Sequence, residues 1–208
     1  MPTLLRGIRY AGRTLRKHIG LSIVAVLALT LGIGLTTTMF SIVYSVMMKG
    51  LPYADANRIV VVFEQNLSRG WQRSSPSMHD FADFKASQRS FEHFAAHYSG
   101  TVNVSGTEKA ERYRGSWVTA SIFDIAGVRP VLGRTIRPGE DAPGGERVAV
   151  IAYSVWKNRY AGEPAVTGRT IGVNGMPFTV VGVMPEKYGF PDDGAIWLPL
   201  QVDPLSVK

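Results

Sequence analysis

The chain has 208 residues, of which 45% are hydrophobic and 19% are charged, and its mean hydropathy is +0.04. This balance excludes a disordered polymer and a protein that lies in the membrane throughout, and it predicts one globular domain with one membrane element. The chain has no cysteine, which excludes a disulfide scaffold, a thiolate metal site and a cysteine nucleophile.

The formal net charge of +7 is concentrated at the N-terminus. No acid occurs before Asp55, and the first bases form a cluster: Arg6, Arg9, Arg13, Arg16 and Lys17. The remaining 18 of the 23 bases nearly balance the 16 acids. A basic face spread over a domain is what nucleic-acid binding requires, so this distribution argues against a DNA or RNA partner.

Residues 1–18 predict a basic amphipathic helix that lies on the membrane surface. At 100° per residue the apolar positions of residues 4–17, LLRGIRYAGRTLRK, fall within about 120°, and the bases fall on the other side. We expect the bases to lie against anionic lipid headgroups. A mitochondrial presequence has the same composition, but the long apolar run that follows disfavours this alternative.

Residues 19–48 carry no formal charge and predict a transmembrane helix. About 20 helical residues cross a hydrocarbon core of about 30 Å, so this run is long enough to span it. A cleaved signal peptide is the main alternative, but its apolar region is shorter and an A-x-A-like site is missing here. The N-terminal bases predict a cytoplasmic N-terminus and an extracytoplasmic position from about residue 50 onward.

Small residues recur at four-residue spacing inside the predicted span. Ala28 and Gly32 form one such ridge, and Thr30, Gly34 and Thr38 form another. Ridges of this kind let a second helix approach closely. Glycine and alanine are also simply frequent in transmembrane helices, so packing through Ala28, Gly32 and Gly34 is a hypothesis.

The segment that follows predicts a strand and then a helix. Residues 58–64, RIVVVFE, are β-branched and typical of a buried strand. Ser77 with Asp80 three positions later is a helix start signal. An apolar set follows, and we expect the helix to end near Gly100; the set is Phe81, Phe84, Phe91, Phe94 and Ala95.

The remainder predicts short strands and turns with two brief helices. Asn174-Gly175, between two alternating runs in residues 170–184, is a strong hairpin signal. The other expected strands are 101–106, 112–120, 147–152 and 195–200, the helices are 121–127 and 153–162, and 137–145 is a turn. The predicted fold class is therefore α+β: an amphipathic helix, one transmembrane helix and a mixed α+β domain with a strand-rich inserted subdomain.

Signals for a chemical site are weak. No G-x-x-x-x-G-K-[ST] motif occurs, so the chain cannot itself be an ATPase, and the G-x-S-x-G, H-E-x-x-H and S-x-x-K patterns are also missing. His93 and His97 lie four apart on the expected helix with His79 nearby, but a metal site needs a third ligand and supporting partners. Ordinary surface histidines explain the pattern more simply.

Two carboxylate pairs invite an acid–base interpretation. They are Glu140 with Asp141 and Asp192 with Asp193, and each pair lies in a turn rich in proline and glycine. Acids in such turns favour local backbone hydrogen bonds, so a structural role is the stronger interpretation. The tryptophans at 71, 117, 156 and 197 are expected in the core or on strand faces. We therefore expect no catalytic residue, no cofactor and no metal in this chain.

The sequence resembles ABC transporter permeases of the MacB-like and FtsX-like superfamily. The stretch RTLRKHIGLSIVAVLALTLGIGLTTTMFSIVYSVMMKGLPYADANRIVVVFE is similar to the first membrane helix of these permeases and its exit. Similarity to the MacB-like periplasmic core domain continues in SMHDFADFKASQRSFEHFAA, GSWVTASIFDIAGVRPVLGRTI, VAVIAYSVWKNRYAGEPAVTGRTIGVNGMPFTVVGVMPEKYGFP and IWLPL. Within this superfamily the sequence most specifically resembles the large duplicated permeases first described in acidobacteria.

The resemblance implies a non-catalytic permease subunit of the bacterial inner membrane, with residues 49–208 as the periplasmic core domain. Residues 58–97 would be the porter-like part and 98–200 the strand-rich part. Because the second half of the porter part and three further membrane helices of the family do not follow, the chain resembles an N-terminal fragment.

The resemblance also implies partners. A separate ATPase subunit would bind ATP and move the membrane helices, and the periplasmic domain would transmit this motion to export or to a periplasmic adaptor. A homodimer or pseudo-dimer through the membrane helices is expected. The alternatives are a membrane-anchored periplasmic binding or sensing module that works without an ATPase and, less favoured, an anchored hydrolase.

Overall fold

The computed structural model describes residues 13, 16–44, 56–66, 71–106, 109–202. These fall into two compact units, Met1–Pro52 and Tyr53–Lys208.

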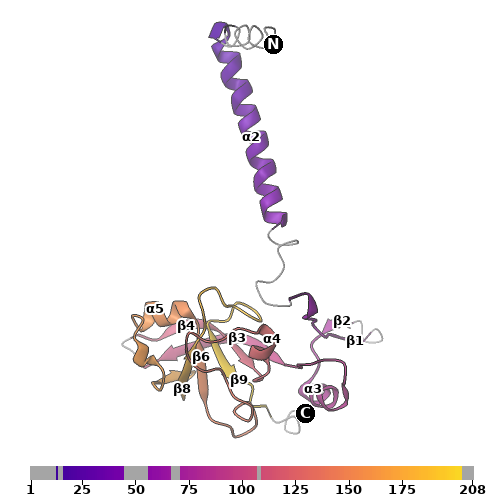
Figure 1. The fold of residues 1–208 in the computed structure, drawn as a ribbon, viewed down its shortest axis with the longest axis vertical. Coiled ribbons are helices and arrows are strands. Elements are labelled where there is room, and N and C mark those ends of the chain that lie inside the picture. The colour runs from indigo at the N-terminus through magenta and orange to yellow at the C-terminus, as the bar shows by residue number, and fades with distance from the viewer. Residues whose placement is uncertain (1–12, 14–15, 45–55, 67–70, 107–108, 203–208) are drawn as a thin grey trace. The chain divides into compact units, whose positions relative to one another are not determined.

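The first unit contains one long helix, α2, which runs from Ile19 to Val43 (Figure 1). Its 25 residues measure about 37 Å, and none of them is buried. It is the one helix in the described ranges that is long and apolar enough to cross a membrane. The predicted surface helix over residues 1–18 falls outside the described residues, except for Arg13 and for Arg16 onward.

The second unit opens with a small substructure over residues 56–96. The 3-10 helix η2 (Ala56–Arg58) precedes a hairpin of β1 (Glu64–Asn66) and β2 (Trp71–Ser74), which form a two-stranded sheet of their own. Helix α3 (Met78–Ser87) follows. None of the described residues from 56 to 96 is buried.

The strand expected over residues 58–64 is wrong. Residues 59–63 have no regular structure, and the large side chains from Val60 to Phe63 are 41 to 67% exposed. Their β-branched composition favours a strand only when neighbouring strands cover it, because β propensity measures the fit of a side chain to a packed sheet. Among the described residues no strand pairs with this run.

The helix at Ser77 begins as predicted but ends earlier. Ser77 and Asp80 form a complete capping box, in which each side chain accepts a hydrogen bond from the other residue's backbone N–H. The helix stops after Ser87, and the Gln88 side chain then accepts a bond from the Phe91 N–H, which turns the chain. The prediction that this helix continues to near Gly100 is wrong, because residues 97–105 form strand β3 of a sheet.

The rest of the unit is a seven-stranded mixed sheet that closes on itself. The strand order is β5-β8-β6-β9-β4-β3-β7, and β7 also pairs with β8. Six strands therefore form a ring, and β5 extends β8 on the side of β7. The strands are β3 (His97–Ser105), β4 (Glu111–Val118), β5 (Leu132–Gly133), β6 (Val148–Ile151), β7 (Thr170–Val173), β8 (Met176–Val183) and β9 (Ile196–Pro199).

Three short helical segments connect the strands of this barrel. They are α4 (Ile122–Ala126), α5 (Tyr153–Arg159) and the 3-10 helix η4 (Pro164–Val166). Helices α4 and α5, the hairpin at Asn174-Gly175 and the strands expected in the second half of the chain are confirmed, whereas η4 was not predicted. Asn174 has φ +50° and Gly175 has φ +81°, the left-handed conformations that a two-residue hairpin turn demands.

The core lies within and around the barrel. Val102 and Val104 are fully buried while Thr101 and Asn103 between and beside them are exposed, so one face of β3 points inward. All four residues of β6 and of β9 are buried, which means that both faces of these strands are covered. Trp197 on β9 is fully buried, and its Nε1–H donates to the Phe190 carbonyl at 2.9 Å.

The predicted packing of the tryptophans is confirmed for three of the four. Trp197 belongs to the core, and Trp117 and Trp156 pack against it. The Trp71 side chain lies outside the described residues. The fold class is confirmed as mixed α+β, with an apolar N-terminal helix and a strand-rich domain.

Candidate functional site

Helix α2 presents an apolar surface in all directions. Its polar side chains do not break this surface, because several threonine hydroxyls donate to the backbone carbonyl four residues earlier. Thr30 bonds to Val26 at 2.8 Å, Thr36 to Gly32 at 2.7 Å and Thr38 to Gly34 at 2.8 Å. Hydroxyls satisfied in this way lower the cost of placing them in lipid.

Both predicted small-residue ridges lie open on α2. A Cβ added at Gly32 or at Gly34 would meet no atom within 4 Å. Gly32 and Gly34 are two residues apart, so their ridges lie on nearly opposite faces, about 160° from one another. Ala28 belongs to the Gly32 ridge. The helix therefore carries two notched faces, not one.

The predicted membrane-interface bases are only partly described. Arg13, Arg16 and Lys17 are exposed, as contact with lipid headgroups requires. Arg6 and Arg9 lie outside the described residues.

The three histidines do not form a metal site. His79 lies on α3, His93 lies after the end of that helix, and His97 is the first residue of β3. The helical spacing of His93 and His97 assumed above is therefore wrong. Within the described ranges no group of three or more His, Asp or Glu side chains is arranged to hold a metal ion.

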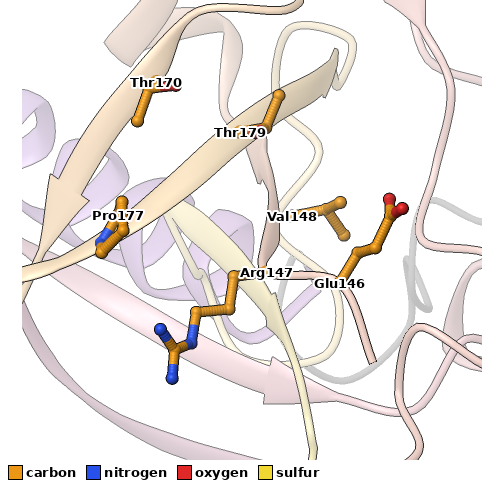
Figure 2. Close-up of a pocket in the computed structure, with 6 residues that line it drawn as sticks. All are labelled: Glu146, Arg147, Val148, Thr170, Pro177 and Thr179. Atoms are coloured by element: carbon orange, nitrogen blue, oxygen red, sulfur yellow. The ribbon is translucent and has the colours of Figure 1, made fainter. Parts of the chain in front are cut away.

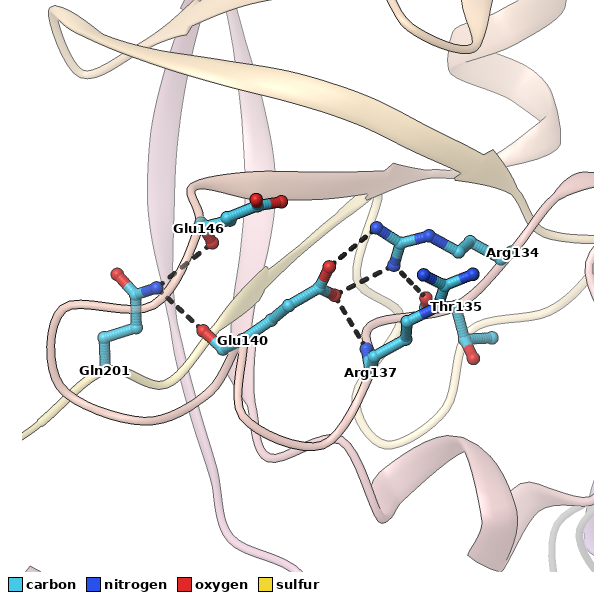
Figure 3. Close-up of polar contacts among 6 residues, drawn as sticks. All are labelled: Arg134, Thr135, Arg137, Glu140, Glu146 and Gln201. Carbon is cyan, nitrogen blue, oxygen red and sulfur yellow. Dashed lines mark hydrogen bonds and ion pairs between the residues drawn. The ribbon is translucent and has the colours of Figure 1, made fainter.

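The Glu140 carboxylate holds a turn together (Figure 3). Arg134 donates to both of its oxygens, at 2.6 and 2.9 Å, and the Arg137 N–H donates to Oε2 at 2.7 Å. Burial alone would raise the pKa of Glu140, but these donors outweigh it and keep the pKa below the ordinary 4.5. Gln201 Nε2 also donates to the backbone carbonyls of Glu140 and Glu146.

The other acids singled out in the sequence also make structural bonds. Asp141 accepts from the Ala120 N–H at 2.8 Å and from the Gly139 N–H at 3.1 Å. Asp192 accepts from the Ser116 hydroxyl at 2.7 Å. These contacts favour a structural interpretation of Glu140, Asp141 and Asp192, since each accepts at least one hydrogen bond from the surrounding chain.

A shallow hollow of about 490 Å³ lies beside strands β6, β7 and β8 (Figure 2). Its lining comes from the segment that leads into β6 and from the paired strands β7 and β8: Glu146, Arg147, Val148, Thr170, Pro177 and Thr179. Figure 2 shows the Glu146 and Arg147 side chains extending in opposite directions. Their charges do not converge on a common point, so the hollow does not present a catalytic pair.

A buried arginine that the sequence pattern did not single out joins α5 to the β3–β4 hairpin. The Arg159 side chain is 2% exposed; its Nη1 lies 3.1 Å from Glu111 Oε2, and its Nη2 donates to the Val104 and Lys109 carbonyls. Burial opposes the charged form, but the neighbouring acceptors raise the pKa of Arg159 overall. Hydrogen bonding by Tyr113 and Arg159 lowers the pKa of Glu111. Only the basic last turn of the predicted helix hinted at this role.

A family model for the MacB-like periplasmic core domain matches residues 22–206. The chain belongs to this family. The match includes part of α2 as well as the whole barrel, and it confirms the resemblance to MacB-like ABC transporter permeases. No curated protein matches the sequence.

Three solved structures resemble this family member. The periplasmic region of MacB from Actinobacillus actinomycetemcomitans is 19% identical with a TM-score of 0.51, over 66% of this chain and 63% of that one. The extracellular domain of the noncanonic ABC-type transporter YknZ from Gram-positive bacteria is 15% identical, with a TM-score of 0.48 over 60% and 63%. A domain of a putative permease from Porphyromonas gingivalis is 16% identical, with a TM-score of 0.41 over 57% of this chain and 55% of that one.

The chain thus spans less than two thirds of each of these relatives. At such low identity the likeness to the MacB region concerns the fold alone.

Proposed function

We propose that this MacB-like chain is a non-catalytic permease part of an ABC-type transporter. Its extracytoplasmic domain transmits ATP-driven movement of the membrane helices to export or to a periplasmic partner. The observation that carries the proposal is the family match over residues 22–206, which joins an apolar helix to the periplasmic core domain in one chain. Residues 1–208 contain no Walker motif, and we assign ATP binding to a separate ATPase subunit.

Helix α2 lies in the bacterial inner membrane and packs against other helices. The open notches at Gly32 and Gly34 support this role, since each admits the backbone of a neighbouring helix. One notched face packs against another helix of the same permease, and the other face forms the dimer or pseudo-dimer contact. The exposed bases Arg13, Arg16 and Lys17 hold the N-terminus on the cytoplasmic side.

Residues 56–96 form one part of a larger porter-like region. Val60, Val61 and Phe63 are exposed at 60, 67 and 44%, and helix α3 has no buried residue. A soluble domain gains little from such surface, whereas a further segment of the permease would bury it. The region is therefore completed by another part of the transporter.

The ATPase partnership is tested by purifying the tagged chain from its native membrane in mild detergent. Mass spectrometry should find a copurified protein that contains a G-x-x-x-x-G-K-[ST] motif. The same purification with α2 replaced by an unrelated transmembrane helix is the matched control, and the ATPase should then be lost. A chain that never recruits such a protein contradicts the proposal and favours an anchored module that works alone.

Helix packing is tested by replacing Gly32 and Gly34 with leucine in a membrane dimerisation reporter. Both replacements fill a notch, so self-association should fall several-fold. Ile33→Leu, which keeps the volume on a different face, is the control and should leave the signal unchanged. An unchanged signal in the glycine variants rejects the packing role.

A further inference from the structure

Asp192, in the loop between β8 and β9, has one carboxylate oxygen without a donor. Ser116 on β4 donates its hydroxyl to Oδ1 at 2.7 Å, and a side chain at Gly194 would collide with this hydroxyl. The other oxygen, Oδ2, is buried and has no hydrogen bond from any described residue. An acceptor buried in this state costs folding free energy, so native proteins nearly always supply a partner.

His97 is placed to supply that partner. Its Nδ1 lies 4.0 Å from Asp192 Oδ2, which is too far for a hydrogen bond but within the distance of an ion pair. The His97 side chain is 39% exposed and the Asp192 side chain 15% exposed, so solvent reaches the imidazole while the carboxylate is shielded. Both nitrogens of a protonated imidazole are donors.

No other charged side chain competes for this pair. Arg114 precedes Ser116 on the same face of β4, and Asp193 adjoins Asp192, but neither forms an ion pair with His97 or Asp192 within the described ranges. On β4, the residue directly opposite His97 is Val118, which carries no charge.

The two residues are distant in sequence and join two different parts of the second unit. His97 is the first residue of β3, directly after the segment 56–96, and Asp192 belongs to the loop that covers Trp197 of the core. A bond between them connects the start of β3 to the loop between β8 and β9.

We propose that protonation of His97 closes an ion pair with Asp192 and so makes this junction tighter in acid. Histidine changes charge between about pH 5 and pH 8. A histidine that gains a partner when protonated adds stability at the acidic end of this range, and the added stability is lost as the pH rises. The junction therefore acts as a proton-sensitive latch.

The test compares thermal unfolding of the full chain in detergent, followed by tryptophan fluorescence, between about pH 8 and about pH 5.5. The Tm of the wild type should exceed that of His97→Gln by about 2 °C or more at the acidic end, and the gap should close at the alkaline end. In an Asp192→Asn background the replacement of His97 should have no pH-dependent effect.

His93→Gln is the matched control, because His93 is exposed and forms no ion pair in the described structure. Its curve should follow the wild type at every pH. Parallel curves for the wild type and His97→Gln would overturn the proposal, as would an acid-dependent gap that persists in the Asp192→Asn background. High salt supplies a second readout, since it should shrink the acidic gap by screening the pair.

Discussion

The barrel and the segment before it are built from equally apolar sequence but differ in what covers that sequence. Every buried residue of the described structure lies between Val102 and Leu200, in or against the barrel. From residue 56 to 96, by contrast, no described side chain is buried, although this stretch contains Val60, Val61 and four phenylalanines around α3. Apolar composition therefore predicts burial only where the chain itself supplies the opposing surface.

The difference separates what this chain does alone from what it does with partners. The barrel closes its own hydrogen bonds through β7 and needs no further strand. The 56–96 segment keeps its local order through short-range devices such as the Ser77–Asp80 capping box and the stacked rings of Phe81 and Phe94, 5.3 Å apart. Such devices fix a helix but do not bury it.

The largest expected difference between the two regions is the cost of removing an aromatic side chain from each. Trp197→Ala deletes a fully buried ring and its hydrogen bond, so it should destabilise the barrel by about 3–5 kcal/mol. Phe84→Ala removes a ring that is 44% exposed and should change the free energy of unfolding by about 0.5 kcal/mol or less. Urea denaturation of the full chain measures both, and equal losses would contradict the contrast.

The second prediction concerns the pH dependence of the barrel. Because the pKa of Glu140 is lowered from 4.5 in the folded state, its contribution is fully present above that value and is lost as the pH falls through the lower folded pKa. Arg134→Gln should cost about 1–2 kcal/mol at neutral pH and flatten the acid limb of the stability curve.

Arg137→Gln is the control for this prediction, because the larger contribution of Arg137 to the lowered pKa of Glu140 comes from its backbone N–H, which the replacement retains, and the smaller one from its charge. Its stability curve should keep the acid limb. Identical acid limbs in the wild type and Arg134→Gln would show that the Arg134–Glu140 pair does not set the acid sensitivity.

The smallest expected effect lies in the segment itself. Ser77→Ala removes the helix cap and should cost α3 about 1 kcal/mol of local stability. Hydrogen exchange of the α3 amides should accelerate while the Tm of the barrel stays constant, because no residue of α3 is buried. A Tm loss as large as that of a core variant would show that α3 is part of the same cooperative unit.

Much of the second unit was predictable because its signals are local. Asn174-Gly175 specified the hairpin, Ser77 specified a helix start, and the alternating or fully apolar runs specified β3, β6 and β9. Wrong predictions arose where pairing with distant residues decides the outcome. Of the run RIVVVFE only the final Glu64 belongs to a strand, and the helix after Ser77 ends before Gln88, after which the chain joins the sheet at His97.

The candidate sites followed the same division. The small-residue ridges at Gly32 and Gly34 can be read from residue spacing along the predicted transmembrane helix, and the N-terminal bases from spacing along the predicted surface helix. The contacts of Arg159 with Glu111 and of His97 with Asp192 join residues 48 and 95 positions apart (159 − 111 and 192 − 97), so no local pattern could reveal them.

Hydrogen exchange on the full chain in detergent tests the central contrast most directly. The account predicts that the amides of β6 and β9 exchange orders of magnitude more slowly than those of residues 60–63 and α3, since only the former are buried and paired. Exchange at residues 60–63 as slow as that in β6 would contradict the account, because it would show that this chain already covers the segment by itself.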